Sequence, residues 1–380
     1  MYNKNGFNVY VSVFLLIALI FSMLAIYTVS AAESKPGVSA KAAVLYEPST
    51  GVFLFEKCAD RRLPMASTTK IMTALVTVEF CNLDDRVVID SRAVGTEGSS
   101  AYLRADDEYS VEELLYALLL NSANDAAVAL ACHISGDVQA FSNLMNDRAA
   151  ALSLKDTHFE NPHGLDSDEH YTTARELAII AAEAMKNDTL CKIVATYKRT
   201  FTEGERTRTY VNHNKLLHLF DGAVGVKTGY TKTSGRCLVG AACRDGLTFI
   251  TVTLDDPCDW QDHGALFEYG YSQLQRLKLC AAGDFSYTLP VVGGDKDTVA
   301  VECEENIGIV TSAGEHEIGS YVKLPRFVTA PISVGDVLGK VIFTLDGDRV
   351  AEAPLVAKGS VTAKDKTTFF KKILSFFRSE

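Results

Sequence analysis

Ser67 and Lys70 stand three residues apart in the segment 64–75, where a proline leads into a run of good helix formers. This pattern predicts that Ser67 lies at or near a helix start and that Lys70 follows one turn later on the same face. A serine hydroxyl is a poor nucleophile until a base takes its proton, and a partly buried lysine can be that base. A capping serine and a surface lysine would explain Ser-x-x-Lys equally well, so the motif alone predicts no chemistry.

Two further motifs follow in order, Ser122-Ala123-Asn124 and Lys227-Thr228-Gly229. The first lies in a polar break between two expected apolar helices, 110–120 and 126–133, and a tight connection of this kind can direct side chains into a cleft. The second precedes two expected strands joined by Asp-Gly, which is a strong signal for a hairpin. The same three motifs occur in this order in serine β-lactamases and penicillin-binding proteins.

The 380-residue chain has a balanced composition, 47% hydrophobic and 22% charged, which is enough for a large core and two domains. Its formal net charge is −11, and the lysines and arginines are scattered among acidic residues. This distribution argues against a nucleic-acid-binding surface, so no nucleic-acid partner is expected. Neither His-Glu-x-x-His nor a paired Cys-x-x-Cys occurs, so no metal site and no cofactor are expected.

Residues 1–31 are expected to be an export signal, followed by a linker at 32–40. Lys4 precedes an apolar run over 9–26, and Val29-Ser30-Ala31 has the small residues of a cleavage site. Cleavage would remove Lys4, the only charged side chain of the signal, and change the formal charge from −11 to −12. A retained N-terminal anchor is the alternative, because the apolar run approaches membrane-spanning length.

Residues 41–277 are expected to form the first domain and residues 278–362 a smaller, β-rich domain. The strands of the second domain are inferred from short alternating segments separated by Gly and Asp turns, at 287–292, 298–303, 308–311, 321–324 and 337–345.

Residues 363–380 are expected to form an amphipathic helix. One broad face would carry Phe369, Phe370, Ile373, Phe376 and Phe377, with lysines and an arginine around it. Such a helix is too short to span a bilayer but suited to lie in its surface. We therefore expect a peripheral protein on the outer face of the bacterial cytoplasmic membrane; a helix docked on its own protein is the alternative.

Nine cysteines in an exported chain suggest disulfides. Their number is odd, however, and several lie within apolar runs, as Cys132 and Cys237 do. Buried free thiols are the preferred interpretation.

From about residue 38 to its C-terminus, the chain resembles the low-molecular-mass penicillin-binding proteins, specifically the serine-type D-Ala-D-Ala carboxypeptidases. The resemblance rests on longer segments around the motifs, at 66–74, 111–126, 161–165, 225–231 and 237–239. It implies an α+β fold of the β-lactamase/transpeptidase type, an antiparallel sheet flanked by helices, with a smaller all-β C-terminal domain and a terminal amphipathic helix. The implied activity is removal of the terminal D-alanine from peptidoglycan stem peptides through a serine acyl-enzyme that β-lactam antibiotics also form.

The resemblance implies a role for each residue of the first two motifs. Ser67 would attack the carbonyl between two D-alanines, and Lys70 would be its base. Ser122 would pass the proton to the leaving amine and hydrogen-bond both motif lysines. Asn124 would hold Lys70 and the substrate amide.

The third motif would form the substrate-binding strand. Lys227 would place positive charge near the terminal carboxylate, Thr228 would bind that carboxylate, and Gly229 continues the same strand. Backbone N–H groups of Ser67 and Tyr230 would form the oxyanion hole.

Two positions depart from better-known relatives. His213 replaces an arginine that helps to hold the substrate carboxylate, so carboxylate binding is expected to depend on Thr228 and Lys227 and to become sensitive to pH. Tyr230 replaces a histidine of some relatives, with little expected effect because only its backbone is needed. His163 is expected to brace its loop rather than to take part in chemistry.

Two other functions compete with this interpretation. A serine β-lactamase shares the fold and motifs, but none of Glu160, Glu169 and Glu176 lies in the Glu-x-x-Leu-Asn pattern that activates water in class A enzymes. A non-catalytic penicillin-sensing or wall-binding module would keep the pocket without turnover, but all motif residues are intact.

Overall fold

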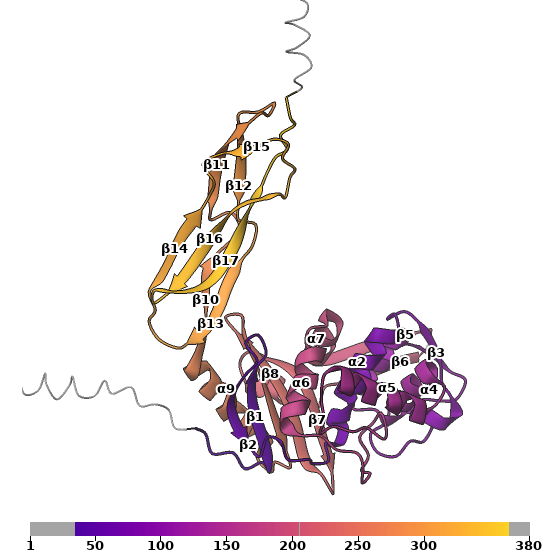
Figure 1. Ribbon diagram of the computed structural model, residues 1–380. Helices are drawn as coiled ribbons and strands as arrows, with labels where there is room; N and C mark the ends of the chain where they lie inside the picture. Colours follow the sequence, from indigo (N-terminus) through magenta and orange to yellow (C-terminus); the bar gives the residue numbers. More distant parts are fainter. Residues whose placement is uncertain (1–34, 205, 365–380) are drawn as a thin grey trace, which may run out of the picture. The chain divides into compact units, whose positions relative to one another are not determined.

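The computed structural model describes residues 35–204 and 206–364 (Figure 1). The expected export signal and the amphipathic tail from residue 365 onward therefore lie outside the described residues. Within the two described ranges, no helix is long and apolar enough to cross a membrane.

A five-stranded antiparallel sheet with the order β2-β1-β9-β8-β7 forms the centre of the first domain. Its strands are β1 (Ala42–Glu47), β2 (Val52–Lys57), β7 (Ala223–Thr231), β8 (Gly235–Arg244) and β9 (Leu247–Leu254). The β8–β9 hairpin that Asp-Gly predicts is confirmed, and β1 and β2 form another hairpin. In the turn of the β8–β9 hairpin, Asp245 and Gly246 have φ values of 50° and 74°, as a tight turn between twisted strands requires. Strand β7 lies at the edge of the sheet.

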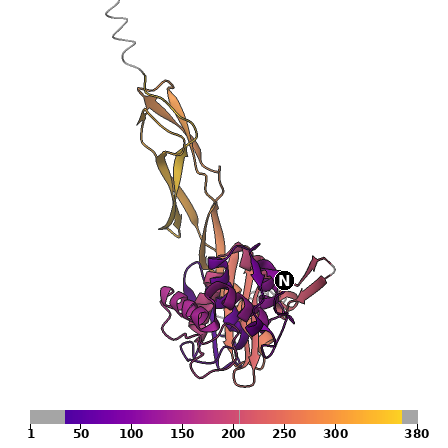
Figure 2. The ribbon, with the colours of Figure 1, turned by 90° about the vertical axis from the view of Figure 1, so that its right-hand side faces the viewer.

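Helices cover both faces of this sheet (Figures 1 and 2). Ala42 and Val44 of β1 belong to a core shared with α6 (Ala174–Ala184), whereas the alternate residues Ala43 and Leu45 belong to a core shared with α9 (Asp259–Gln273). The larger core also takes in α2 (Lys70–Phe80), α3 (Val111–Leu119), α4 (Asn124–Ser135), α5 (Val138–Ala151) and α7 (Asp188–Ala195). The smaller core includes Leu216 of the short helix α8 (Leu216–Leu219).

Short elements complete the first domain. They are the 3₁₀ turns η1 (Ala66–Thr69) and η2 (Ser91–Ala93), the hairpin of β3 (Arg86–Val88) with β4 (Glu108–Ser110), and the hairpin of β5 (Lys198–Glu203) with β6 (Arg206–Val211). The β5–β6 hairpin stands out from the helices in Figure 2.

Local signals placed several helix ends well. Ser110 caps α3, because its side chain accepts a hydrogen bond from the backbone N–H of Glu113. A helix at 262–274 is also predicted from the sequence; the observed helix α9 begins three residues earlier, at Asp259. Helices α7 and α8 had no counterpart among the expected elements.

The second domain is all-β, with a six-stranded sheet of order β14-β16-β17-β12-β11-β15 and a pair β10–β13. The strands are β10 (Leu274–Cys280), β11 (Ser286–Val292), β12 (Thr298–Glu302), β13 (Ile307–Ser312), β14 (Ile318–Lys323), β15 (Val328–Thr329), β16 (Val337–Leu345) and β17 (Asp348–Ala357). All five expected segments are strands. The expected boundary between residues 277 and 278 falls inside β10, which pairs with β13 along its length; we therefore place the boundary at the end of α9.

All nine cysteines are free thiols, as expected, but only three are buried. These are Cys237 in β8 and the pair Cys280 and Cys303, whose Sγ atoms are 4.0 Å apart in the core of the second domain. Cys58 and Cys258 are exposed.

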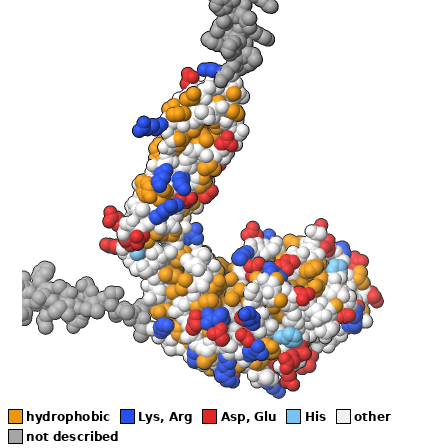
Figure 3. Space-filling view, in the orientation of Figure 1, with side chains coloured by type: hydrophobic (Ala, Val, Ile, Leu, Met, Phe, Trp, Pro, Cys, Tyr) orange, Lys and Arg blue, Asp and Glu red, His pale blue; other side chains and the backbone are white. Residues whose placement is uncertain are grey.

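Basic side chains are scattered over the face drawn in Figure 3, and many stand beside acidic ones. Arg175 pairs with Glu56 and Asp60, and Arg148 pairs with Glu79 and Glu183. These partly exposed pairs join elements far apart in the sequence, although each contributes little to stability.

Candidate active site

Ser67 lies in the turn η1, which leads directly into α2. The turn brings the two side chains of the first motif together, and Lys70 Nζ lies 3.0 Å from Ser67 Oγ. Ala66 has a φ of +48°, a conformation that L-residues rarely adopt. This sharp bend sets the hydroxyl at the start of the helix, where the sequence predicted it.

Lys70 is fully buried, and three oxygen atoms surround its amino group. Besides Ser67 Oγ, they are Oδ1 of Asn124 and the backbone oxygen of His163, each at 2.6 Å. Burial, and to a lesser extent the charge of Lys227, holds the pKa of Lys70 well below its usual value. An amine in this setting can accept a proton from the neighbouring hydroxyl.

Asn124 is the first residue of α4, which begins two residues earlier than expected. Its Nδ2 donates to the backbone oxygen of Glu97 over 2.5 Å, so both ends of the amide are fixed. The next residue, Asp125, accepts hydrogen bonds from the loop 100–103 through the backbone N–H groups of Ala101 and Leu103 and the hydroxyl of Ser100. The second motif is therefore anchored to a loop that precedes it by about twenty residues.

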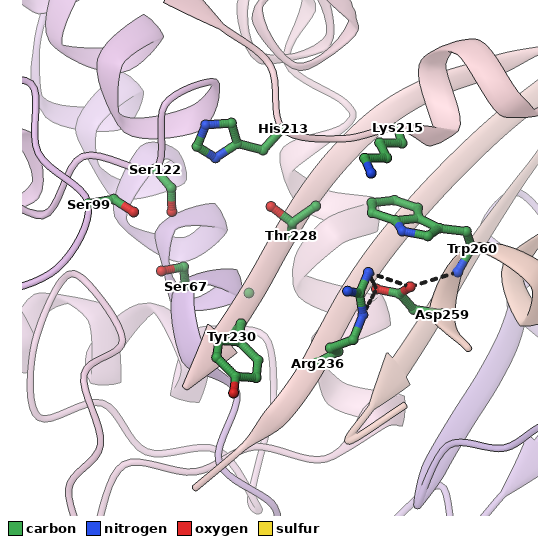
Figure 4. A pocket seen from close by; sticks show the side chains of 11 residues that line it. Ser67, Ser99, Ser122, His213, Lys215, Thr228, Tyr230, Arg236, Asp259 and Trp260 are labelled. Carbon is green, nitrogen blue, oxygen red and sulfur yellow. Dashed lines mark hydrogen bonds and ion pairs between the residues drawn. The ribbon is translucent and has the colours of Figure 1, made fainter. Parts of the chain in front are cut away.

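Ser122 is 5% exposed and has a φ of +59°, and its hydroxyl lies in the cleft near that of Ser67 (Figure 4). Its expected hydrogen bonds to both lysines are not formed between these described residues. Lys70 is engaged by three other oxygens, and Lys227 Nζ donates to the backbone oxygen of Thr228 at 2.8 Å.

The third motif lies on the edge strand β7, beside the nucleophile. A Cβ atom at position 229 would lie 3.0 Å from the backbone nitrogen of Ser67, so Gly229 allows this close approach. Lys227 is 1% exposed, and burial lowers its pKa to about 7. Tyr230, by contrast, leaves 66% of its surface exposed.

The loop 160–171 packs against the start of helix α2. The backbone oxygen of Pro162 accepts from Thr73 Oγ1 over 2.6 Å, next to the contact of His163 with Lys70. His170 accepts from the backbone N–H of Glu160 through Nδ1, which leaves Nε2 as the donor to Thr69 Oγ1 at 2.8 Å. Burial lowers the pKa of His163 to about 3 and that of His170 to about 4, so both rings are neutral and structural.

A cleft of about 360 Å³ opens over these residues (Figure 4). Six of the expected site residues line it: Ser67, Ser122, His213, Thr228, Gly229 and Tyr230. Lys70, Asn124 and Lys227 lie buried at its base. His213 is exposed at the cleft, and partial desolvation and the charge of Lys227 lower its pKa. All nine expected residues thus gather at one place.

Five further residues line the cleft and were not expected from the sequence: Ser99, Lys215, Arg236, Asp259 and Trp260. Arg236 is on β8, opposite Tyr230 of β7, and Asp259 and Trp260 are the first two residues of α9. Lys215 is two residues from His213, so its place in the cleft could have been predicted from the sequence. The others carry no local signal, because only the pairing of β7 with β8 and the packing of α9 bring them there.

This arrangement has the parts of an acyl-transfer site: a serine hydroxyl, a buried amine at hydrogen-bond distance, and an edge strand against the serine backbone. The described residues include no group of three or more His, Cys, Asp or Glu side chains able to hold a metal ion.

Comparisons with known proteins agree with this class of site. A family model described as D-alanyl-D-alanine carboxypeptidase matches residues 29–258, and one described as penicillin-binding protein 5, C-terminal domain, matches residues 275–363. The D-alanyl-D-alanine carboxypeptidase DacF of Bacillus subtilis is 32% identical over 88% of this chain and 89% of its own length. The corresponding DacC of Escherichia coli is 29% identical over 90% and 88%.

Solved structures show the same relationship. Penicillin-binding protein 5 of Haemophilus influenzae superposes with a TM-score of 0.62 at 31% identity, covering 87% of this chain and 99% of its own. The Streptomyces K15 DD-transpeptidase superposes with a TM-score of 0.59 at 36% identity, covering 63% of this chain and 99% of its own. Fold and site define a serine enzyme of the penicillin-binding class. More specifically, the chain belongs to the D-alanyl-D-alanine carboxypeptidase family of low-molecular-mass penicillin-binding proteins.

Proposed function

We propose that this chain removes the terminal D-alanine from peptidoglycan stem peptides, with Ser67 as nucleophile and Lys70 as general base. The observation that carries the proposal is the environment of Lys70 Nζ, which is buried against Ser67 Oγ, Asn124 Oδ1 and the oxygen of His163. A neutral amine has two N–H groups and one lone pair. If the N–H groups point to the two carbonyl oxygens, the lone pair points to the serine hydroxyl and can take its proton.

The remaining groups follow the reaction. Backbone N–H groups of Ser67 and Tyr230 stabilise the oxyanion as the serine adds to the carbonyl. Ser122, whose hydroxyl is free to turn in the cleft, passes the proton to the leaving amine. Thr228 on β7 binds the terminal carboxylate, and Lys227 adds positive charge beneath it. Water then hydrolyses the acyl-enzyme and releases the shortened peptide.

The loop near the acyl-enzyme argues against a β-lactamase. At the nucleophile it presents the backbone oxygen of His163, not a carboxylate. Glu176 binds the backbone N–H groups of Lys155 and Asp156, and Glu160 accepts from Ser167. These two carboxylates are engaged elsewhere, which argues against either as the base that hydrolyses a penicilloyl group, so β-lactams should act as lasting acylating agents.

The test is release of free D-alanine from an acyl-Lys-D-Ala-D-Ala peptide, together with covalent labelling by a fluorescent penicillin. We expect both for the wild-type chain and neither for Ser67→Ala. Labelling of Ser67→Ala at full stoichiometry would disprove the assignment of the nucleophile. If the wild type is labelled but releases no D-alanine, with or without an added amine acceptor, the chain is a penicillin-binding module without peptidase activity.

We also propose that the chain is exported and attached to the membrane surface by its C-terminal tail. The support is the aromatic and basic pattern of residues 369–378. Deletion of residues 367–380 should release the protein into the soluble fraction with its activity intact. Sedimentation of the truncated protein with membranes would contradict the anchor, and N-terminal sequencing that finds Met1 on the exported protein would contradict signal cleavage.

A further inference from the structure

The cleft contains a second cluster of charged side chains beyond the motif residues. Lys215, Arg236, Asp259 and Trp260 form the wall opposite Ser67, with Thr228 between the two sides (Figure 4). We propose that Arg236 is the residue that selects substrates with a free C-terminal carboxylate. This inference rests on the proposed carboxypeptidase activity and names the residue of that site which recognises the C-terminal carboxylate of the peptide.

Strand pairing places Arg236 beside the expected carboxylate position. Thr228 of β7 is opposite Leu238 of β8, and Arg236 is two residues from Leu238, opposite Tyr230. Because side chains alternate along a strand, Thr228 and Arg236 project from the same face of the sheet as diagonal neighbours, within the reach of a long side chain. The guanidinium can therefore share a ligand with the threonine hydroxyl.

Asp259 holds the Arg236 side chain in a defined orientation. Nε and Nη2 of Arg236 donate to the carboxylate over 2.7 to 3.0 Å, and Asp259 is only 4% exposed. The indole ring of Trp260 lies 5.6 Å from the guanidinium carbon. In Figure 4 the remaining guanidinium nitrogen is on the side that faces Thr228. One edge of the guanidinium is thus fixed by the protein, and the other can donate to a carboxylate.

The other candidates for this role carry less dependable charge. Burial lowers the pKa of Lys227 to about 7, and its amino group is directed to the backbone oxygen of Thr228. Partial desolvation and the charge of Lys227 lower the pKa of His213, which disfavours a positive charge on its ring. Lys215 is an exposed, flexible cation without the fixed planar geometry that matches a carboxylate. Arg236 remains protonated, and although Asp259 compensates its charge, the N–H groups that Asp259 does not bind keep the planar geometry that matches a carboxylate.

The experiment compares two peptides, acyl-Lys-D-Ala-D-Ala and the same peptide ending in a carboxamide, with wild type and Arg236→Ala. We expect Arg236→Ala to lower kcat/KM for the carboxylate peptide by roughly 10- to 100-fold, mainly through KM, because a charged hydrogen bond is lost. Cleavage of the amide peptide should change less than threefold. Arg236→Lys should recover part of the loss, and His213→Arg in the Arg236→Ala background should recover more, since His213 lines the same cleft.

Arg244→Ala is the matched control. Arg244 is on the same strand, pairs with the carboxylate of Glu268 and lies 4.4 Å from the ring of Phe220, but it is not part of the cleft. It should leave both peptides unaffected. Equal losses on the two peptides, or no loss with Arg236→Ala, would overturn the role of Arg236. A wild-type protein that releases no D-alanine would instead reject the proposed function itself.

Discussion

Two buried lysines lie within one small site, and neither has a carboxylate among its hydrogen-bond partners in the described part of the chain. Lys70 Nζ is within hydrogen-bond distance of a hydroxyl and two carbonyl oxygens, and Lys227 donates to one backbone oxygen. Without a carboxylate partner, burial favours the neutral amine in both cases. The two buried amines therefore cost stability, and we infer that this cost is linked to the proposed roles of Lys70 as a base and of Lys227 near the substrate carboxylate.

This cost is measurable at Lys227. Its pKa falls from 10.5 to about 7 on folding, so between these pH values the unfolded chain binds more protons and the free energy of unfolding rises with pH. A shift of this size corresponds to a destabilisation of the folded state by about 4 to 5 kcal/mol. This destabilisation is present in full below pH 7 and absent above pH 10.5. Lys227→Met should therefore increase the free energy of unfolding at pH 7 by roughly 2 to 4 kcal/mol, after allowing for the lost hydrogen bond to Thr228.

Urea unfolding at pH 7 and pH 10 gives the comparison, and the gain should shrink at the higher pH. Lys215→Met is the control, since it removes a lysine of the same cleft that is exposed. A pH-independent gain at Lys227, or an equal gain at Lys215, would show that burial of the amine is not the cause.

At the scale of elements, the loop 160–171 and the start of α2 behave as one unit. Three backbone and side-chain contacts join them, from Lys70 to His163, from Thr73 to Pro162 and from Thr69 to His170. Gly164 permits this contact: its φ is +89°, and a Cβ there would lie 1.9 Å from the backbone oxygen of Ala66. The loop cannot approach the nucleophile turn in this way with any other residue.

Gly164→Ala should lower the free energy of unfolding by about 3 kcal/mol or more and slow acylation by penicillin, because the loop must move away from Lys70. Gly136→Ala is a matched control at the end of α4: its φ is +84°, but nothing lies within 4 Å of the added Cβ. It should cost only about 1 kcal/mol and leave the acylation rate unchanged. Stopped-flow acylation and urea unfolding of the two variants would separate the clash from backbone strain, and equal effects would refute the coupling.

The same elements show how far sequence reasoning reaches. Proline and capping signals predicted where α2 and α3 begin, and Asp-Gly predicted the β8–β9 hairpin. These features could be predicted because they depend on residues that are neighbours in the sequence. Arg236 and Trp260 were missed because their place in the cleft depends on strand register and on helix α9 packing beside β8. Only part of the hydrogen bonding of Lys70 was predicted. Its contact with His163 is to the backbone oxygen, which every residue type has, so no sequence signal indicates it.

At the scale of the whole molecule, the chain has separate hydrophobic cores for its two domains. The core of the second domain includes Val301, Phe343 and Leu355 and draws all its buried members from residues 280–361. Phe343 is 1% exposed and packs edge-on against Phe285 at 5.7 Å. Although Val310 of β13 packs against the core that includes Phe267, the second core shares no buried member with the first domain, so we predict that the two domains unfold in separate transitions.

Scanning calorimetry of the full chain tests this independence. Acylation by a penicillin stabilises only the domain that binds it, so it should raise one transition and leave the other in place. Phe343→Ala should lower the midpoint temperature of the penicillin-insensitive transition by roughly 10 °C or more, as expected for 3 to 5 kcal/mol lost from a small core. It should not change D-alanine release. Phe267→Ala, in the core beneath α9, should lower the penicillin-sensitive transition instead. A single transition that both substitutions and the penicillin shift together would mean that the second domain is required for the stability of the catalytic fold.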